Sequence, residues 1–210
     1  MGKTSGSTTG GLGRGDGNYK GEIKGKESLK NIQNPAVYKA VKEAISRVYS
    51  VLGAKERNVK LATLRDGVGG VHSASYDAMS GQKLDSGVYL NKKIFKPKTA
   101  TTQSVAKWAK GGYDSGHLTK TNKPVAHIVT HEMAHAIWTD TGTSPQQRAA
   151  RKDIGRLYST WLKDNKKTGY GKYARTNVSE FWAETCTKAV HGTSDKYTKR
   201  VKAIIKKYSL

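Results

Sequence analysis

The chain has 210 residues and a formal net charge of +22, from 38 Lys and Arg against 16 Asp and Glu. Its hydrophobic fraction of 35% allows one compact core, and no stretch approaches the roughly 18 apolar residues that a membrane-spanning helix needs. The single cysteine, Cys186, excludes an intramolecular disulfide, and the N-terminus has no apolar stretch typical of a secretory signal. We therefore expect a protein without a signal peptide that is cytoplasmic in the producing cell.

The chain begins with a segment that differs in composition from the rest. Residues 1–30 are rich in Gly, Ser, Thr and Lys, which predicts a flexible basic arm with no core of its own. Residues 31–210 would then form a single folded domain. Asn34 before Pro35 is a helix start, and apolar residues at helical spacing follow as far as Gly53, which is placed to end that helix.

The segments after this first helix change in period from strand-like to helical. Alternating apolar and polar residues, with glycines between the segments, predict three strands, at 58–65, 71–77 and 87–95. Residues 97–123 predict a long loop with at most a short helix at 105–110. The remaining pattern predicts four helices, at 125–139, 145–164, 178–190 and 195–208. A helix, a small sheet and then a run of helices indicate an α+β fold.

The predicted helix 125–139 carries an H-E-x-x-H motif, from His131 through Glu132 to His135. Residues four apart lie on one face of a helix, so two imidazoles can reach one metal ion. Glu132 is next to the first ligand and is placed to reach a water on the metal rather than the metal itself. The alternative is a pair of core or surface histidines that bind no metal.

A catalytic zinc site needs a third protein ligand and one open position. Glu180 and Glu184 are again four residues apart on a predicted helix, with Phe181, Trp182 and Ala183 between them. Two carboxylates on an apolar helix are costly unless a cation lies opposite, and a metal with its histidines meets that need. The alternative is a surface helix with two solvated glutamates.

These two blocks, together with a tyrosine seven residues before Glu180, resemble the anthrax-lethal-factor-like gluzincins. That group of zinc peptidase domains includes toxins and many phage and mobile-element proteins. The resemblance covers roughly residues 86–190 and implies a zincin-like fold. It implies Zn²⁺ bound by His131, His135 and Glu180, with Glu184 supporting the site from behind and Tyr173 stabilising the transition state. It also implies that strand 87–95 is an edge strand that pairs with an extended substrate.

Other residues of interest fit no such pattern. His127 lies one turn before His131, where a histidine more often caps the helix or faces solvent, and we expect no ligand role for it. His72, His117 and His191 have no partner in a recognisable motif, and we expect Cys186 to be a packed small side chain. The basic amphipathic segment 196–208 is either a closing helix with a solvated lysine face or a contact with nucleic acid, a membrane or a partner protein.

Two functions remain open from the sequence. The first is an active zinc endopeptidase with a polypeptide substrate, in which Glu132 is the general base and Tyr173 helps to hold the oxyanion. The second is a structural or packaged protein, for example in a phage virion, whose basic surface binds DNA or acidic capsid proteins. The charge favours the second, because residues 1–60, 61–130 and 131–210 carry +7, +6 and +9. The intact motif favours the first, because a purely structural zinc site does not need Glu132.

Overall fold

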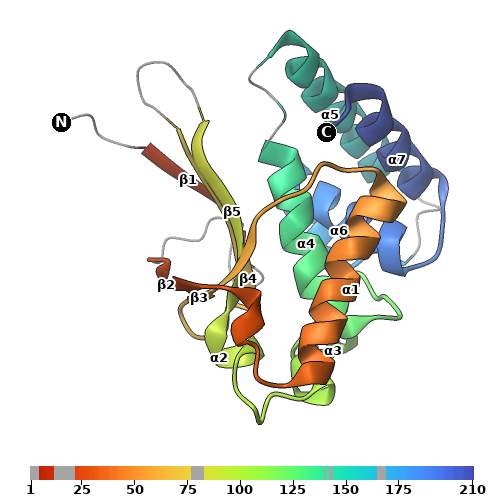
Figure 1. Cartoon of the computed structure of the whole chain (residues 1–210). Helices are drawn as coiled ribbons and strands as arrows, with labels where there is room; N and C mark the ends of the chain where they lie inside the picture. The colour runs from red at the N-terminus through yellow and green to blue at the C-terminus, as the bar shows by residue number, and fades with distance from the viewer. Residues whose placement is uncertain (1–4, 12–21, 77–82, 140, 142–143, 165–168) are drawn as a thin grey trace.

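The fold is α+β, as the sequence predicted. The computed structural model describes residues 5–11, 22–76, 83–139, 141, 144–164 and 169–210. Within them, a five-stranded sheet lies on one side of the molecule and the long helices lie on the other, with α4 next to the sheet (Figure 1). No helix in these described ranges has the length and apolar character needed to cross a membrane.

The sheet is mixed, with strand order β1-β4-β5-β3-β2. Its strands are β1 (Ser5–Gly11), β2 (Lys24–Glu27), β3 (Val59–Thr63), β4 (Gly70–Tyr76) and β5 (Lys83–Asn91). β3 and β5 run parallel, and the other neighbouring pairs are antiparallel. The strand predicted at 58–65 is thus β3, and the strand predicted at 71–77 is β4.

The prediction of an edge strand at 87–95 is wrong. β5 pairs with β4 on one side and with β3 on the other, so it lies inside the sheet. The physical reason is that backbone hydrogen bonds pair both edges of the strand, and the buried side chains of Val88, Tyr89 and Leu90 show that both of its faces are covered as well. The strand also ends early, at Asn91, whose side chain accepts a hydrogen bond from Lys93 N at 3.1 Å and starts the short helix α2 (Lys92–Phe95).

The arm predicted over 1–30 also differs from the structure, which places two of its segments in the sheet. β1 pairs with β4 and β2 pairs with β3, followed by a 3₁₀ turn at Leu29–Asn31. Backbone pairing of this kind needs no apolar side chains, so a composition rich in Gly and Ser does not exclude it. Residues 1–4 and 12–21 of the predicted arm lie outside the described residues.

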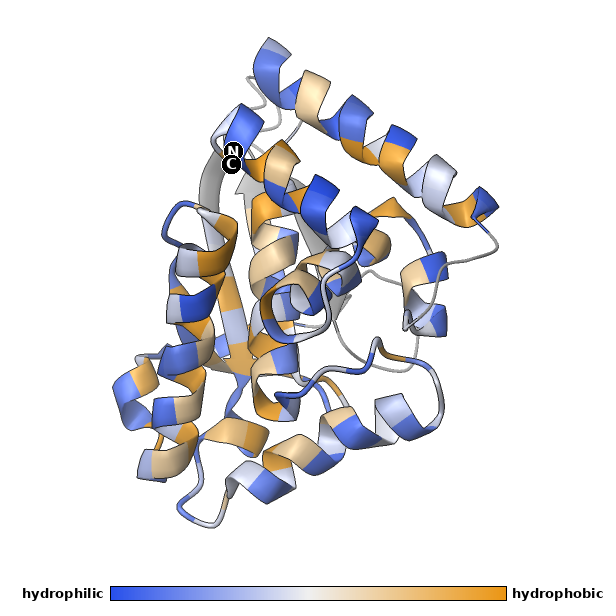
Figure 2. Ribbon diagram, turned by 90° about the vertical axis from the view of Figure 1, so that its right-hand side faces the viewer, coloured by the Kyte–Doolittle hydropathy of each residue, from blue (hydrophilic) through white to orange (hydrophobic). Residues whose placement is uncertain are grey.

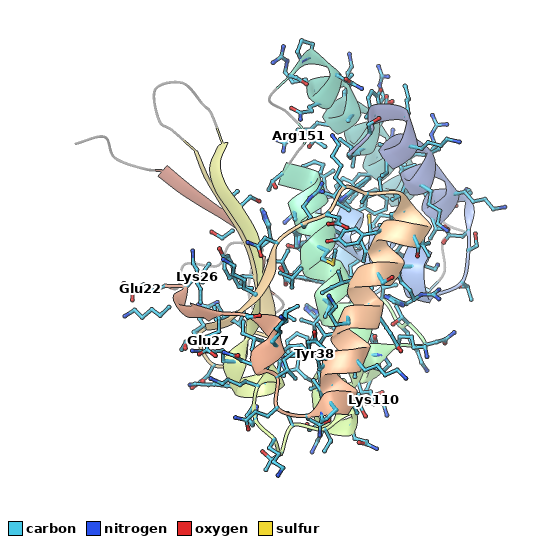
Figure 3. The ribbon with its side chains drawn as sticks, viewed as in Figure 1. Glu22, Lys26, Glu27, Tyr38, Lys110 and Arg151 are labelled. Carbon is cyan, nitrogen blue, oxygen red and sulfur yellow. The ribbon has the colours of Figure 1, made fainter. Side chains whose placement is uncertain are left out.

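One glutamate ties this N-terminal region to α2. Glu27, labelled in Figure 3, lies at the end of β2 and forms ion pairs with Lys92 Nζ at 2.5 Å and Lys96 Nζ at 2.7 Å. Its carboxylate also accepts a hydrogen bond from Asn31 Nδ2 at 2.9 Å. The hydrogen bonds from Lys92, Lys96 and Asn31 lower the pKa of Glu27 to about 2.

The first helix, α1 (Pro35–Leu52), has the ends that the sequence predicted. The Asn34 side chain accepts hydrogen bonds from the first-turn amides Ala36 N and Val37 N. Gly53 ends the helix in the left-handed conformation with φ of 67°, which glycine adopts without steric cost. The apolar stripe of the helix is buried, at Val37, Val41, Ala44, Ile45, Val48 and Leu52.

The long loop predicted over 97–123 is partly wrong, because α3 (Thr102–Asp114) occupies half of it. Thr101 and Ser104 form a capping box, with Ser104 N donating to Thr101 Oγ1 at 3.1 Å and Thr101 N donating to Ser104 Oγ at 2.9 Å. The buried residues of α3 are Val105, Ala106 and Ala109. Because these apolar side chains are small, the sequence shows little helical periodicity in this segment.

The C-terminal half is helical, as predicted. It comprises α4 (Pro124–Thr139), α5 (Pro145–Lys163), a 3₁₀ turn at Lys172–Arg175, α6 (Val178–His191) and α7 (Lys196–Tyr208). Residues 125–139 of α4 are all buried, because the helix lies between the sheet and α1 and α6. The outer helices instead alternate hydrophilic and hydrophobic residues (Figure 2). α7 packs on α5 and α6, which favours the closing-helix interpretation of segment 196–208.

Candidate metal centre

Three donor atoms from α4 and α6 converge in the core. His131 Nε2 and His135 Nε2 lie 3.0 Å apart, and Glu180 Oε2 lies 3.1 Å from the first and 3.2 Å from the second. All three side chains are buried. This is one of two buried groups in the described chain that could hold a metal ion; the other comprises His127, His131 and Glu184.

The helix geometry explains why these side chains meet. His131 and His135 are one turn apart on α4 and so point in one direction. Glu180 is in the first turn of α6, where Asn177 caps the helix by accepting a hydrogen bond from Glu180 N at 2.9 Å. The indole of Trp182 donates to Ala134 O at 3.0 Å, which holds the two helices in register. Both helices therefore fix the positions of the three donor atoms.

The chemistry of the first group fits a divalent metal ion. Ligand atoms about 2.0–2.1 Å from a tetrahedral zinc lie roughly 3.3 Å from one another, close to the observed spacing. Glu180 Oε1 is buried and has no hydrogen-bond partner among the described residues. A buried carboxylate oxygen without a partner is costly, and a cation would remove that cost. In the second group, by contrast, protein donors reach both oxygens of Glu184.

The electrostatics of the site place a proton where a metal would bind. Burial opposes protonation of His131, but hydrogen bonds with Glu180 and Glu184 outweigh it and raise its pKa to about 10. Burial likewise opposes ionisation of Glu180, while its electrostatic interaction with His135 and its hydrogen bond with His131 lower its pKa to about 2. The metal-free site thus holds a carboxylate against a protonated imidazole.

The second nitrogen of each imidazole is also held. His131 Nδ1 donates to Glu184 Oε1 at 2.9 Å, and His135 Nδ1 lies 3.0 Å from Ser179 Oγ. Glu184 is fully buried, and its other oxygen accepts a hydrogen bond from Thr119 N at 2.5 Å. Such contacts orient the rings and leave both Nε2 atoms facing the same point. Glu184 thus touches His131 from behind and stays out of the Glu180 group.

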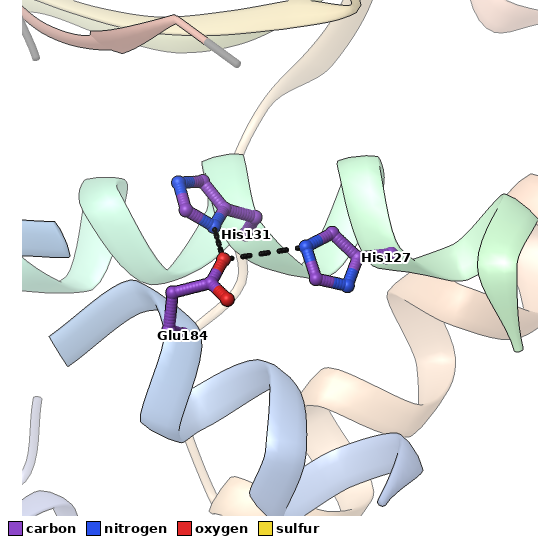
Figure 4. A group of neighbouring side chains, drawn as sticks. All are labelled: His127, His131 and Glu184. Atoms are coloured by element: carbon purple, nitrogen blue, oxygen red, sulfur yellow. Dashed lines mark hydrogen bonds and ion pairs between the residues drawn. The ribbon is translucent and has the colours of Figure 1, made fainter. Parts of the chain in front are cut away.

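His127 differs from expectation, because it is fully buried rather than solvent-facing. Figure 4 shows its ring beside Glu184, with His127 Nε2 3.3 Å from Glu184 Oε1. Its Nδ1 lies 3.1 Å from the Tyr113 hydroxyl. His127 precedes His131 by four residues, so the two side chains lie on the same helix face. This spacing is the feature of the sequence that could have indicated that His127 lies near the site. Thr119 and Ser179, which contact the site from a loop and a helix start, gave no signal in the sequence.

Glu132 is fully buried and packs against the sheet. A Cβ atom on Gly70, the first residue of β4, would lie 2.9 Å from Glu132 Cγ and 3.3 Å from the main-chain oxygen of Tyr89. Gly70 therefore allows α4 to approach the strand so closely that Glu132 fits between them. β4 is therefore a strand that borders Glu132.

Tyr173 lies over the first histidine of the motif. Its ring centroid is 5.8 Å from that of His131 and 4.8 Å from that of His117. Tyr173 N donates to His117 O at 2.8 Å, which anchors the 3₁₀ turn to the loop after α3. Burial, followed by the negative charges of Glu180 and Glu132, raises the pKa of the Tyr173 hydroxyl well above its ordinary value. The hydroxyl is therefore a neutral hydrogen-bond donor at physiological pH.

Comparison with known proteins adds nothing to this geometry: no protein-family model, no curated protein and no solved structure matches the chain.

Proposed function

We propose that this chain is a zinc-dependent peptidase on a zincin-like fold. The observation that carries the proposal is the buried triangle of His131, His135 and Glu180 donor atoms, with a glutamate directly after the first histidine. Two histidines and one carboxylate form a ligand set used by catalytic zinc, with room left for a fourth ligand. A zinc ion bound there supplies Lewis acidity, which polarises a peptide carbonyl and makes water a stronger acid.

The protein groups around this set suit peptide hydrolysis. Glu132 takes a proton from the attacking water and passes it to the departing amine. Tyr173, as a neutral donor, hydrogen-bonds the carbonyl oxygen as negative charge develops on it. Glu184 keeps the His131 ring in one orientation by accepting from its Nδ1. A site that only stabilised the fold would need neither Glu132 nor Tyr173.

The net charge of +22 favours a second candidate, a particle-associated protein that binds DNA or acidic proteins. The lysines of α7 that face away from the core carry part of that charge, at Lys196, Lys199, Lys206 and Lys207. The two functions are compatible in one molecule, since no metal-site residue is on α7. They differ in what Glu132 does, and a single substitution separates them.

The test is Glu132→Gln, which keeps the side-chain volume and removes the base. We expect the variant to bind one zinc and to melt within a few degrees of the wild type, while cleavage of a mixed peptide library falls about 10²- to 10⁴-fold. Glu43→Gln, on the exposed face of α1, is the matched control and should keep full activity. Zinc content by elemental analysis and cleavage by mass spectrometry are the measurements. A wild-type protein that holds zinc and cleaves no peptide overturns the proposal.

A further inference from the structure

A large cavity opens beside the candidate metal centre. Its volume is about 960 Å³, and its walls come from the β3–β4 loop, α3, the loop after α3 and the 3₁₀ turn at Lys172–Arg175. Three apolar side chains contribute to the lining, Val68, Trp108 and Leu118. This volume is at the upper end of the range for binding pockets and exceeds what one side chain fills.

The cavity adjoins the residues that would do chemistry. On one wall, Lys172 directly precedes Tyr173, and the His117 ring lies 4.8 Å from the Tyr173 ring. Val68 also lines the cavity, and Gly69 and Gly70 follow it in the chain. A Cβ on Gly69 would lie 3.4 Å from Trp108, and a Cβ on Gly70 would contact Glu132. When a polypeptide is bound with its cleaved bond between Glu132 and Tyr173, the side chains next to that bond therefore lie at this cavity.

The charge of the lining is predominantly positive. Arg65 and Lys172 are both exposed at the cavity, and His117 also lines it. The one acidic lining residue, Asp66, is already paired with Lys93 Nζ at 2.6 Å. Cations on the rim of an apolar cleft act through a medium less polar than bulk water, so they select a ligand of opposite charge.

We infer that this cavity is the substrate-selecting pocket of the enzyme, and that it takes a polypeptide segment with carboxylate side chains next to the cleaved bond. The inference rests on the proposed peptidase function. Arg65 and Lys172 bind the carboxylates, and Trp108 and Leu118 pack against the aliphatic parts of the same side chains. The substrate class is thus an acidic segment of a protein, in keeping with the charge of the whole chain.

Cleavage of matched peptides tests the inference. Peptides that carry Glu, Gln or Lys at each position around the cleaved bond are compared by kcat/KM with the zinc-loaded protein. We expect Glu to be preferred over Lys on one side of the bond, because only one side faces the cavity. In Arg65→Gln/Lys172→Gln the Glu-to-Gln ratio should fall by about two- to fivefold for each cation removed, as for a solvent-exposed ion pair.

A charge-matched control distinguishes the effect of the cations in this pocket from the effect of the protein's overall positive charge. Lys42→Gln/Lys199→Gln removes two exposed cations from α1 and α7, neither of which lines the cavity. It should keep the wild-type Glu-to-Gln ratio. An unchanged ratio in Arg65→Gln/Lys172→Gln, or an equal fall in the control, overturns the inference and leaves the peptidase function standing.

Binding without catalysis keeps the two proposals distinguishable. Zinc-loaded Glu132→Gln is titrated by calorimetry with a Glu-rich decapeptide and with its Gln counterpart. Tighter binding of the acidic peptide, weakened by Arg65→Gln/Lys172→Gln and not by the control, supports the pocket even if no peptide is cleaved. Equal affinity for both peptides refutes it, whatever the activity of the wild type.

Discussion

Replacing Glu184 should weaken metal binding although Glu184 does not contact the metal. Its carboxylate is fully buried and accepts hydrogen bonds from Thr119 N at 2.5 Å and His131 Nδ1 at 2.9 Å. Losing a carboxylate that orients a metal-bound histidine typically lowers affinity 10- to 100-fold, or about 1.4 to 2.7 kcal/mol. We expect Glu184→Ala to show a loss in this range while still binding one zinc at saturation.

The same substitution should also destabilise the metal-free protein. It leaves two buried donors, on Thr119 and His131, without their acceptor, at about 1–3 kcal/mol each. The sum of about 2–6 kcal/mol is a large part of the roughly 5–15 kcal/mol by which domains are stable. Glu184→Gln is therefore the companion variant, because it keeps the volume and one acceptor oxygen. Its amide end must still face an N–H donor, so a smaller loss in the same direction is expected.

Zinc affinity measured by competition with a chromophoric chelator, alongside thermal melts with and without zinc, gives both quantities. Glu180→Gln serves as the comparison, because it removes a ligand and should lose far more affinity than either Glu184 variant. Glu43→Ala, on the exposed face of α1, is the negative control. If folded Glu184→Gln and Glu184→Ala both bind zinc within twofold of the wild type, the orienting role assigned to Glu184 is refuted.

Four further outcomes follow from the same structure. Tyr173→Phe should lower kcat about 10²- to 10³-fold with KM and zinc content little changed, since it removes one oxyanion donor; a change in KM alone would make Tyr173 a binding residue. Zinc binding at pH 7 should release a proton, because the pKa of His131 is raised to about 10 in the metal-free site; calorimetry in two buffers of different ionisation enthalpy measures it, and no release would contradict the ion pair. Glu27→Gln should lower the melting temperature at pH 6 but much less at pH 3, because the pKa of Glu27 is lowered to about 2 and its contribution is lost as the pH falls from about 4.5 towards that value; an equal effect at both pH values would argue against the pairs with Lys92 and Lys96. Full-length protein should bind DNA of any sequence at about 50 mM salt and release it steeply as salt rises; no binding there would make the charge a solubility feature.

The sequence alone determined the features that depend on short-range spacing. The cap at Asn34 and the glycine at 53 set helix ends through hydrogen bonds within a few residues. The i, i+4 spacing in the H-E-x-x-H motif and between Glu180 and Glu184 placed each pair on one helix face before any tertiary contact was known. These patterns identified the candidate ligand set, because a helix converts spacing directly into direction.

Only the tertiary structure decided which elements lie side by side and which buried groups meet. The position of β5 inside the sheet and the pairing of β1 with β4 depend on backbone hydrogen bonds that any sequence can make, so composition left them undetermined. The contacts of Glu184 join residues 53 and 65 positions apart in the chain, at His131 and Thr119. His127 became buried because α4 is enclosed by the sheet, α1 and α6, and a helical pattern does not report such enclosure.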